Sequence, residues 1–180
     1  STSGPIGQVT AKIYDGLFEY GFYMKPQPCL AESWTVAPDG KTVTFKLRRG
    51  VKFHDGKAFT SADVQFTIME VLKKVHPRGI NTFKEVTAVE TPDAQTVIFK
   101  LANAAPYMMA ALSGYESPMI PKHIYGSGDI RSHDSANKPV GTGPFKFVEW
   151  RRGELVRLDR NPDYWRSGQP YLDRIVVRFI

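Results

Sequence analysis

The sequence predicts a mixed fold of the α+β or α/β class for a chain of 180 residues. Residues 33–48 and 83–101 alternate apolar and polar side chains with the period of half-buried strands. Between them, residues 61–74 place apolar side chains at helical spacing. A chain of this length buries about 70% of its unfolded surface, enough for one domain or two small ones.

Two hairpins are expected. In the first, alternating residues flank Pro38-Asp39-Gly40, a sequence typical of a turn because Pro presets φ and Gly accepts positive φ. In the second, strands over residues 83–90 and 95–101 flank Thr91-Pro92-Asp93. The residues that define the first pattern are Trp34, Val36, Val43, Phe45 and Leu47.

The central helix has a defined start. Thr60 stands at the N-cap position and Asp63 three residues later, a capping-box variant with Asp where Glu or Gln is usual. Its apolar stripe predicts a helix over 61–74. Pro77 disfavours helix at His76, so residues 76–79 are interpreted as a loop.

The same signals predict the remaining elements: helices over residues 7–17 and 106–113, a helical turn over 121–125, a polar surface loop over 126–139, and strands over 145–148, 155–158 and 175–180. The last strand is apolar throughout, so we expect it to need neighbours on both faces and the chain to continue beyond it. Tyr20, Phe22 and Tyr23 are expected in a core or an interface, with a ligand pocket as the alternative.

Composition excludes several classes. Cys29 is the single cysteine, so no intrachain disulfide forms, and we expect it to be a packing residue. No apolar run reaches the roughly 20 residues of a membrane span. Ser1–Thr10 lack the basic start and apolar core of a secretion signal, so the chain is either cytosolic or already trimmed.

The formal net charge is +6, which is compatible with an anionic partner. The basic residues are scattered, however, which favours a solvated surface. Trp150-Arg151-Arg152, with Phe145 and Phe147 on one strand face, keeps open an alternative function, a basic nucleic-acid-binding β-rich domain. The same aromatic face also fits a core.

No catalytic or metal motif is evident. Gly141-x-Gly143 is followed by Pro144 and a strand pattern, whereas a phosphate loop opens a helix. The histidines lack metal-site spacing, and the acidic pairs are undistinguished. We expect no cofactor, no metal and no enzymatic activity; an enzyme with a diffuse site is the third hypothesis. The residues concerned are His54, His76, His123, His133, Asp129, Asp134, Glu149 and Glu154.

One long stretch resembles a known family. Ala31-Glu-Ser-Trp34, Asp39-Gly-Lys-Thr42 and Thr44 to Val64 resemble the signature region of the extracellular solute-binding proteins of ABC importers, family 5, the dipeptide/oligopeptide/nickel class. The resemblance continues through Pro139 to Phe147 and Arg160-Asn-Pro-Asp-Tyr-Trp165, in the same order and spacing. Essentially the whole chain is covered.

The resemblance implies a two-lobe periplasmic-binding-protein fold, type II and cluster C-like, of which this chain is part of the first lobe and the second lobe is absent. It implies that residues 1–24 and 127–180 form the main part of that lobe. Residues 25–126 would form an inserted β-rich subdomain with two hairpins and the capped helix.

The implied function is capture of a small solute in a cleft between lobes and its delivery to the ABC permease subunits in the membrane. A peptide is favoured, with a nickel chelate, a sugar or an opine as alternatives, and no nucleic acid. ATP would be used by a separate subunit. The implied location is the periplasm or the extracellular face of the membrane. A fragment of such a protein is also expected to expose apolar surface and to self-associate.

The resemblance also points to ligand-facing loops: the loop before the first helix, the loop after the capped helix, and a loop near residue 115. Loops held by rigid elements commonly carry binding residues. The expected ligand-binding residues are Thr2, Ser3, Gly4, Arg78, Gly114, Tyr115 and Glu116. The strongest motifs, at Trp34, Gly141-Thr-Gly143 and Asn161–Trp165, are interpreted as scaffold.

Overall fold

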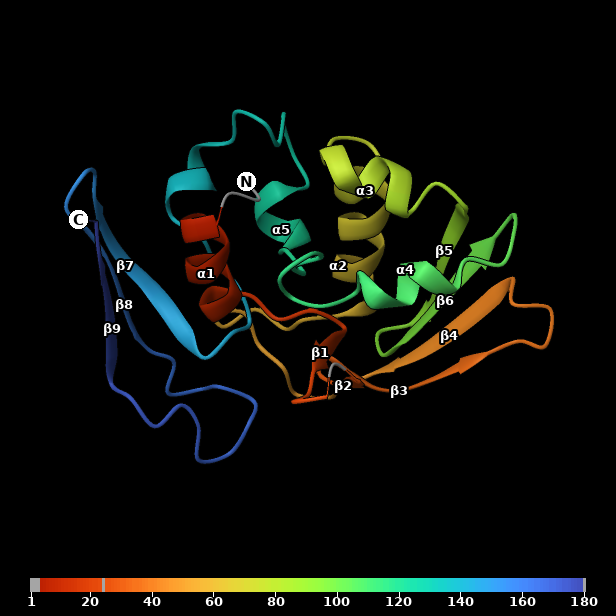
Figure 1. Cartoon of the computed structure of the whole chain (residues 1–180), viewed down its shortest axis with the longest axis horizontal. Coiled ribbons are helices and arrows are strands. Elements are labelled where there is room, and N and C mark those ends of the chain that lie inside the picture. Colours follow the sequence, from red (N-terminus) through yellow and green to blue (C-terminus); the bar gives the residue numbers. More distant parts are fainter. Residues whose placement is uncertain (1–3, 24, 180) are drawn as a thin grey trace.

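The computed structural model describes residues 4–23 and 25–179, which form a mixed arrangement of helices and three antiparallel sheets. In Figure 1 a three-stranded sheet lies on one side of the molecule with helix α1 beside it, and a four-stranded sheet lies on the other side with α2, α3 and α4. None of the described helices is long and apolar enough to cross a membrane.

The helical elements are α1 (Gly4–Ile13), α2 (Ser61–Phe66), the π-helix η1 (Thr67–Leu72), α3 (Pro77–Thr82), α4 (Pro106–Ala110), α5 (Lys122–Tyr125) and the 3-10 helix η2 (Asp134–Asn137). The strands are β1 (Phe18–Tyr20), β2 (Pro26–Pro28), β3 (Ala31–Val36), β4 (Thr42–Leu47), β5 (Val86–Asp93), β6 (Thr96–Leu101), β7 (Phe145–Arg151), β8 (Leu155–Arg160) and β9 (Arg174–Arg178).

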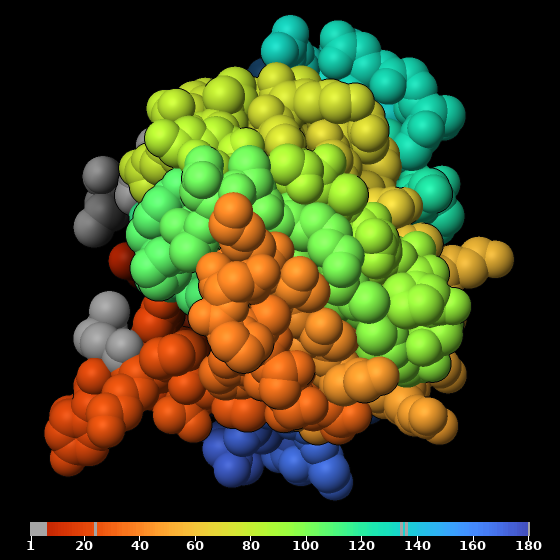
Figure 2. All heavy atoms as spheres, turned by 90° about the vertical axis from the view of Figure 1, so that its right-hand side faces the viewer, coloured from red at the N-terminus to blue at the C-terminus, as the bar shows by residue number. Residues whose placement is uncertain are grey.

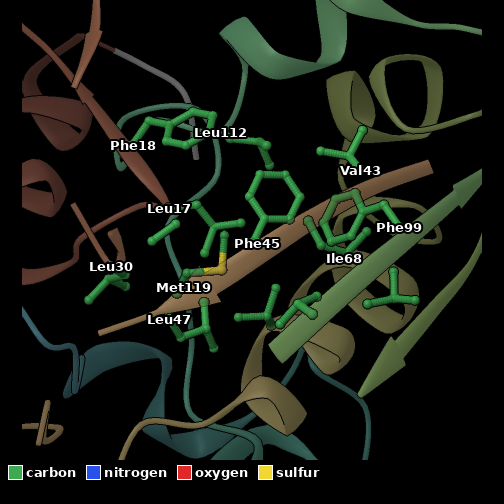
Figure 3. Packing of buried hydrophobic residues seen from close by; sticks show 14 of the residues in the cluster. Leu17, Phe18, Leu30, Val43, Phe45, Leu47, Ile68, Phe99, Leu112 and Met119 are labelled. Carbon is green, nitrogen blue, oxygen red and sulfur yellow. The ribbon is translucent and has the colours of Figure 1, made fainter. Parts of the chain in front are cut away.

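Both predicted hairpins are present and combine in one sheet of order β3-β4-β6-β5. The predicted alternation places Val43, Phe45 and Leu47 on the buried face of β4. Phe45 packs edge-on against Phe99 of β6, with ring centroids 5.0 Å apart, as the close-up in Figure 3 shows. Val36 departs from the pattern and is 52% exposed at the end of β3. The sheet therefore has one buried face, which forms much of the larger hydrophobic core.

The capped helix begins where the sequence predicts. The Asp63 carboxylate accepts from the Thr60 backbone N–H at 2.9 Å, and its second oxygen accepts from the Lys122 N–H, also at 2.9 Å. The expectation of one regular helix over 61–74 is wrong in its second half. From Thr67 the helix widens to a π-helix, in which the Lys73 N–H bonds the Ile68 carbonyl, five residues back.

The predicted loop at residues 76–79 is instead the start of helix α3. The Pro77 ring occupies the first helical turn, where its missing N–H costs nothing. The His76 imidazole accepts from the Gly79 N–H at 3.1 Å and caps the helix. Pro77 therefore disfavours a helical conformation at His76 but is well suited to begin the helix that follows.

The three-stranded sheet of order β7-β8-β9 packs one face against α1. Phe145 and Leu158 pack there against Ile13 of α1. Each of these three side chains is at most 5% exposed. Phe145 is thus a core residue rather than part of an exposed stacking platform for bases. Phe147 is partly buried in the same cluster.

The last strand has one exposed face among the described residues, so the neighbour that the sequence predicts for that face stays a prediction. β9 begins at Arg174 and alternates between exposed and half-buried residues. Val176 is 45% exposed because it lies on the face opposite α1, beside Arg174 and Arg178 of the same strand. Described strands pair with β9 on one side only, where β8 lies.

Two expectations near the beginning of the chain are also corrected. The helix predicted over 7–17 starts and ends earlier, and residues 14–17 form an irregular segment that leads into β1. Phe22 and Tyr23 are 96% and 81% exposed, so they are not core residues, while the interface and the ligand pocket stay predictions. They lie in the turn after β1, which projects from the body of the molecule at the lower left of Figure 2.

The buried apolar residues form two clusters, one against the four-stranded sheet and one between α1 and the three-stranded sheet. Cys29 is buried, and burial raises the pKa of its thiol, so the thiol stays protonated. The division of the chain at residues 24 and 127 stays a prediction.

His54 links the turn before α2 to the segment before β7. Its backbone N–H donates to the Gly141 carbonyl at 2.8 Å, and its Nδ1 accepts from the Gly141 N–H at 3.3 Å. Because Nδ1 accepts, Nε2 carries the proton and donates to the Gly143 carbonyl at 2.9 Å. Burial, with a contribution from the charge of Lys146, lowers the pKa of His54 to about 4. The folded protein therefore favours the neutral imidazole.

This arrangement predicts acid sensitivity. A pKa below the unfolded value means that the stabilisation is complete above about pH 6.5 and is lost as the pH falls toward 4. For one proton the free energy of unfolding falls by up to about 1.4 kcal/mol per pH unit in this window. Denaturant titrations at several pH values measure this slope. His54→Gln, which cannot titrate, is expected to flatten it, and His133→Gln serves as the control. Equal slopes in the wild type and His54→Gln contradict the assignment.

Candidate functional site

The structure describes five of the seven expected ligand-binding residues. Thr2 and Ser3 lie outside the described residues, and Gly4 is the first residue of α1. Arg78 lies in the first turn of α3. Gly114, Tyr115 and Glu116 lie in the loop between α4 and α5.

Arg78 and Glu116 come together although they are distant in sequence. The Arg78 Nη1 lies 3.1 Å from Glu116 Oε1 and 3.3 Å from Glu116 Oε2. The two side chains are 57% and 33% exposed, so the pair lies at the surface. It joins α3 to the loop after α4.

Tyr115 joins the same loop to α1. A Cβ atom built on Gly7 would lie 2.7 Å from Cε2 of the Tyr115 ring, too close for any residue but glycine without movement of the ring. The ring therefore packs on the α1 backbone at Gly7, while Tyr115 remains 46% exposed. We refer to Gly7, Arg78, Tyr115 and Glu116 as the rim site.

Gly7 was not expected from the sequence. A glycine inside an amphipathic helix costs about 1 kcal/mol relative to alanine. That cost is a signal of close packing, but the sequence does not reveal which side chain packs there.

The position of Arg78 is set by the start of α3. A Cβ on Gly79 would lie 2.3 Å from the Leu72 carbonyl oxygen, so α3 packs directly on the end of η1. Partial burial lowers the pKa of His76, and its Nδ1 is an acceptor. His76 is therefore neutral near pH 7 and adds no positive charge beside Arg78.

The loop that carries Tyr115 and Glu116 is anchored on the extended segment after α1. A Cβ on Gly16 would lie 2.3 Å from the Gly114 nitrogen, so the two backbones are in direct contact. The Phe18 N–H donates to the Leu112 carbonyl at 3.1 Å, and the Met119 N–H donates to the Asp15 carbonyl at 3.0 Å. Both ends of the loop are thus held by residues 15–18.

Asp15 holds that segment in turn. Its carboxylate is buried, with Oδ2 accepting from Trp165 Nε1 at 2.9 Å and from the Thr142 hydroxyl at 3.0 Å. The Tyr164 hydroxyl lies 3.4 Å from Oδ1. Burial raises the pKa of Asp15, and these donors together with the charge of Arg166 oppose the rise. One carboxylate therefore connects three segments that are remote in sequence.

Trp165 is fixed by cations on its ring. The guanidinium carbons of Arg48 and Arg166 lie 4.4 Å and 4.6 Å from the ring centroid. Arg166 also pairs with Glu19 of β1. These contacts confirm the interpretation of Asn161–Trp165 as scaffold. The role of Asp15 was not expected from the sequence. An acidic residue between apolar neighbours, in residues 13–17, was the one feature that could have indicated a buried carboxylate.

The rim site offers a guanidinium, a carboxylate and an aromatic ring at one surface. These groups bind charges and stack on planar groups. Among residues 4–23 and 25–179, no three His, Cys, Asp or Glu side chains are grouped to hold a metal ion.

The class of protein follows from comparison with known families. The sequence pattern described as bacterial extracellular solute-binding proteins, family 5 Middle, matches residues 25–180. The chain belongs to this family. Its fold corresponds to part of a two-lobe periplasmic binding protein.

Three relatives illustrate the match. The oligopeptide-binding protein AppA of Bacillus subtilis is 37% identical over 158 residues, which is 84% of this chain and 28% of AppA. The structure of AppA in complex with a nonapeptide superposes with a TM-score of 0.90 at 34% identity, covering 100% of this chain and 36% of AppA. This chain thus spans about a third of such relatives.

NikZ from Campylobacter jejuni, in complex with Ni(L-His), has a TM-score of 0.85 at 29% identity and covers 93% of this chain and 34% of its own. AgaA of A. tumefaciens, in complex with agropinic acid, has a TM-score of 0.86 at 36% identity and covers 100% of this chain and 36% of its own. The same fold thus occurs in proteins solved with a peptide, a nickel chelate and an opine.

The Asp15 contacts generate a stability prediction. Asp15→Asn keeps the size of the side chain but removes its charge, and the NH2 group that replaces one carboxylate oxygen meets either the donors of Trp165 and Thr142 or the hydroxyl of Tyr164. Because hydrogen bonds to a charged group contribute about 1.5–3 kcal/mol each, we expect the free energy of unfolding to fall by at least that amount. Denaturant unfolding measures it.

Asp173→Asn is the matched control, since the Asp173 side chain is 92% exposed. It is expected to change the free energy of unfolding by no more than about 0.5 kcal/mol. Equal stability of the two variants would show that Asp15 does not hold these segments together.

Proposed function

We propose that this chain is the solute-binding component of an ABC importer, or part of one, and that its ligand is a peptide. Family membership supports the class of protein, and the nonapeptide in AppA supports the class of ligand. The alternative ligands are a nickel chelate, as in NikZ, an opine, as in AgaA, and a sugar. No catalytic step is part of this proposal.

The rim site is the proposed ligand-facing surface of this chain. Arg78 and Glu116 supply charge, and Tyr115 supplies an exposed aromatic ring held on α1. Because Gly114 has no side chain, the loop backbone lies directly on Gly16, and this contact positions the neighbouring Tyr115. Gly4 stands at the same end of α1 as Gly7. Thr2 and Ser3 stay predictions.

The proposed mechanism has three steps: the solute enters a cleft between two lobes, the lobes close about a hinge, and the closed protein docks on permease subunits in the membrane. This chain contributes one wall of the cleft. The binding step takes place in the periplasm or outside the cell, in agreement with the extracellular description of the family.

The test is retention of peptides by the protein as its gene encodes it. The protein is incubated with an equimolar mixture of tripeptides, nickel–histidine and opines, separated from unbound solutes, and denatured for mass spectrometry. We expect peptides to be enriched. Because Tyr115 stacks on the bound solute, Tyr115→Ala should lower retention about tenfold.

Tyr107→Ala is the matched control, because Tyr107 is 50% exposed on α4 and Tyr115 is 46% exposed. It should retain peptides as the wild type does. Enrichment of nickel–histidine or an opine instead of peptides would replace the proposed ligand. Retention of no solute at all would overturn the proposed function.

A further inference from the structure

Two surface cavities adjoin at a contact between α5 and the turn before α2. One, of about 540 Å³, has His123 in its lining, and the other, of about 430 Å³, has Asp55. His123 Nε2 lies 2.6 Å from Asp55 Oδ2, so the two cavities are neighbours. Each cavity is lined by two lysines. We refer to these four residues as the lysine face: Lys57 and Lys122 in the first cavity, and Lys138 and Lys146 in the second.

The carboxylates beside the first cavity bind the backbone of its lysines rather than their ammonium groups. Asp55 Oδ1 accepts from the Lys57 backbone N–H at 3.1 Å, and Asp63 Oδ1 accepts from the Lys122 backbone N–H at 2.9 Å. The second oxygen of Asp55 pairs with His123, and that of Asp63 accepts from Thr60. Within residues 4–23 and 25–179, the ammonium groups of Lys57 and Lys122 form no ion pair.

The same contacts hold the two lysines in place. The Phe53 N–H donates to the Lys57 carbonyl at 2.8 Å and closes the turn that carries Lys57. The Phe53 ring also packs edge-on against the imidazole of His123, with ring centroids 5.6 Å apart. Lys57 and Lys122 are both exposed. Two uncompensated cations therefore stand at the surface on a backbone that is fixed by hydrogen bonds.

We propose that the lysine face docks on the anionic headgroups of a lipid bilayer, with one headgroup phosphate bound between Lys57 and Lys122. The second cavity places two more lysines beside the first, which suits an array of anions better than a single one. The formal net charge of +6 adds a general attraction to such a surface. The family is extracellular, which favours a membrane over nucleic acid as the polyanion that the protein meets.

The lysine face shares no residue with the rim site, so lipid and solute bind independently. The inference therefore goes beyond the proposed function and does not rest on its ligand. Retention of peptides should be unchanged by substitutions in the lysine face, which keeps the two tests separate.

Vesicle sedimentation tests the inference. The protein as its gene encodes it, produced without attached lipid, is mixed with vesicles of phosphatidylcholine alone or of equal parts phosphatidylcholine and phosphatidylglycerol. We expect binding to the anionic vesicles only. Raising the salt concentration from about 0.01 M to about 1 M shortens the Debye length from about 30 Å to about 3 Å and should release the protein.

The double variant Lys57→Gln/Lys122→Gln should lower the partition coefficient into the anionic vesicles about 25-fold, at about fivefold for each lysine. Lys41→Gln/Lys84→Gln is the matched control, because it removes the same charge from two other exposed lysines. Lys41 lies in the β3–β4 turn, at the opposite end of the molecule from β7 (Figure 1). The control should lower the coefficient by less than about twofold, since charges beyond a Debye length from the bilayer are screened.

Several outcomes would overturn the inference. Equal losses in the two double variants would show that binding follows net charge and not the lysine face. Absence of binding to the anionic vesicles at low salt would refute docking altogether. Tighter binding to a single-stranded oligonucleotide than to the vesicles, lost in Lys57→Gln/Lys122→Gln, would assign the face to nucleic acid. Release from the vesicles by inorganic phosphate, but not by chloride at equal ionic strength, would assign the first cavity to free phosphate.

Discussion

The carboxylate of Asp15 is the contact on which the described structure most depends. A buried charge is costly unless donors surround it, and here the donors come from Thr142, Tyr164 and Trp165. Removing any of them leaves a carboxylate with too few partners. The requirement therefore fixes the segment after α1 against two later parts of the chain.

The same segment supports the rim site. The backbone of Asp15 accepts from Met119, and the backbone of Gly16 lies against Gly114. The loop carrying Tyr115 and Glu116 is thereby attached to the segment that the buried Asp15 carboxylate anchors. A binding protein that recognises solutes by charge needs its groups held at fixed separation, because flexible groups lose affinity to the entropy of ordering. The residues that hold the fold together at Asp15 therefore also position the proposed site.

The features predicted from sequence are those that depend on neighbouring residues. The turn at Pro38-Asp39-Gly40 and the capping contact of Asp63 each lie within a few residues, so local rules suffice. The Arg78–Glu116 pair, the Tyr115 ring on Gly7 and the donors of Asp15 link residues far apart in sequence. No periodicity or turn signal carries such information. Resemblance to a family pointed to the loops, but not to the contacts between them.

We infer that the Asp15 junction and the loop anchored on it open as one cooperative unit. Native-state hydrogen exchange tests it through two protons, the Trp165 indole N–H on the carboxylate and the Met119 amide N–H on the backbone carbonyl of Asp15. We expect both protons to exchange with the same free energy of opening, close to that of global unfolding. Exchange of the Met119 amide at the rate of an exposed loop, with the indole still protected, would contradict it.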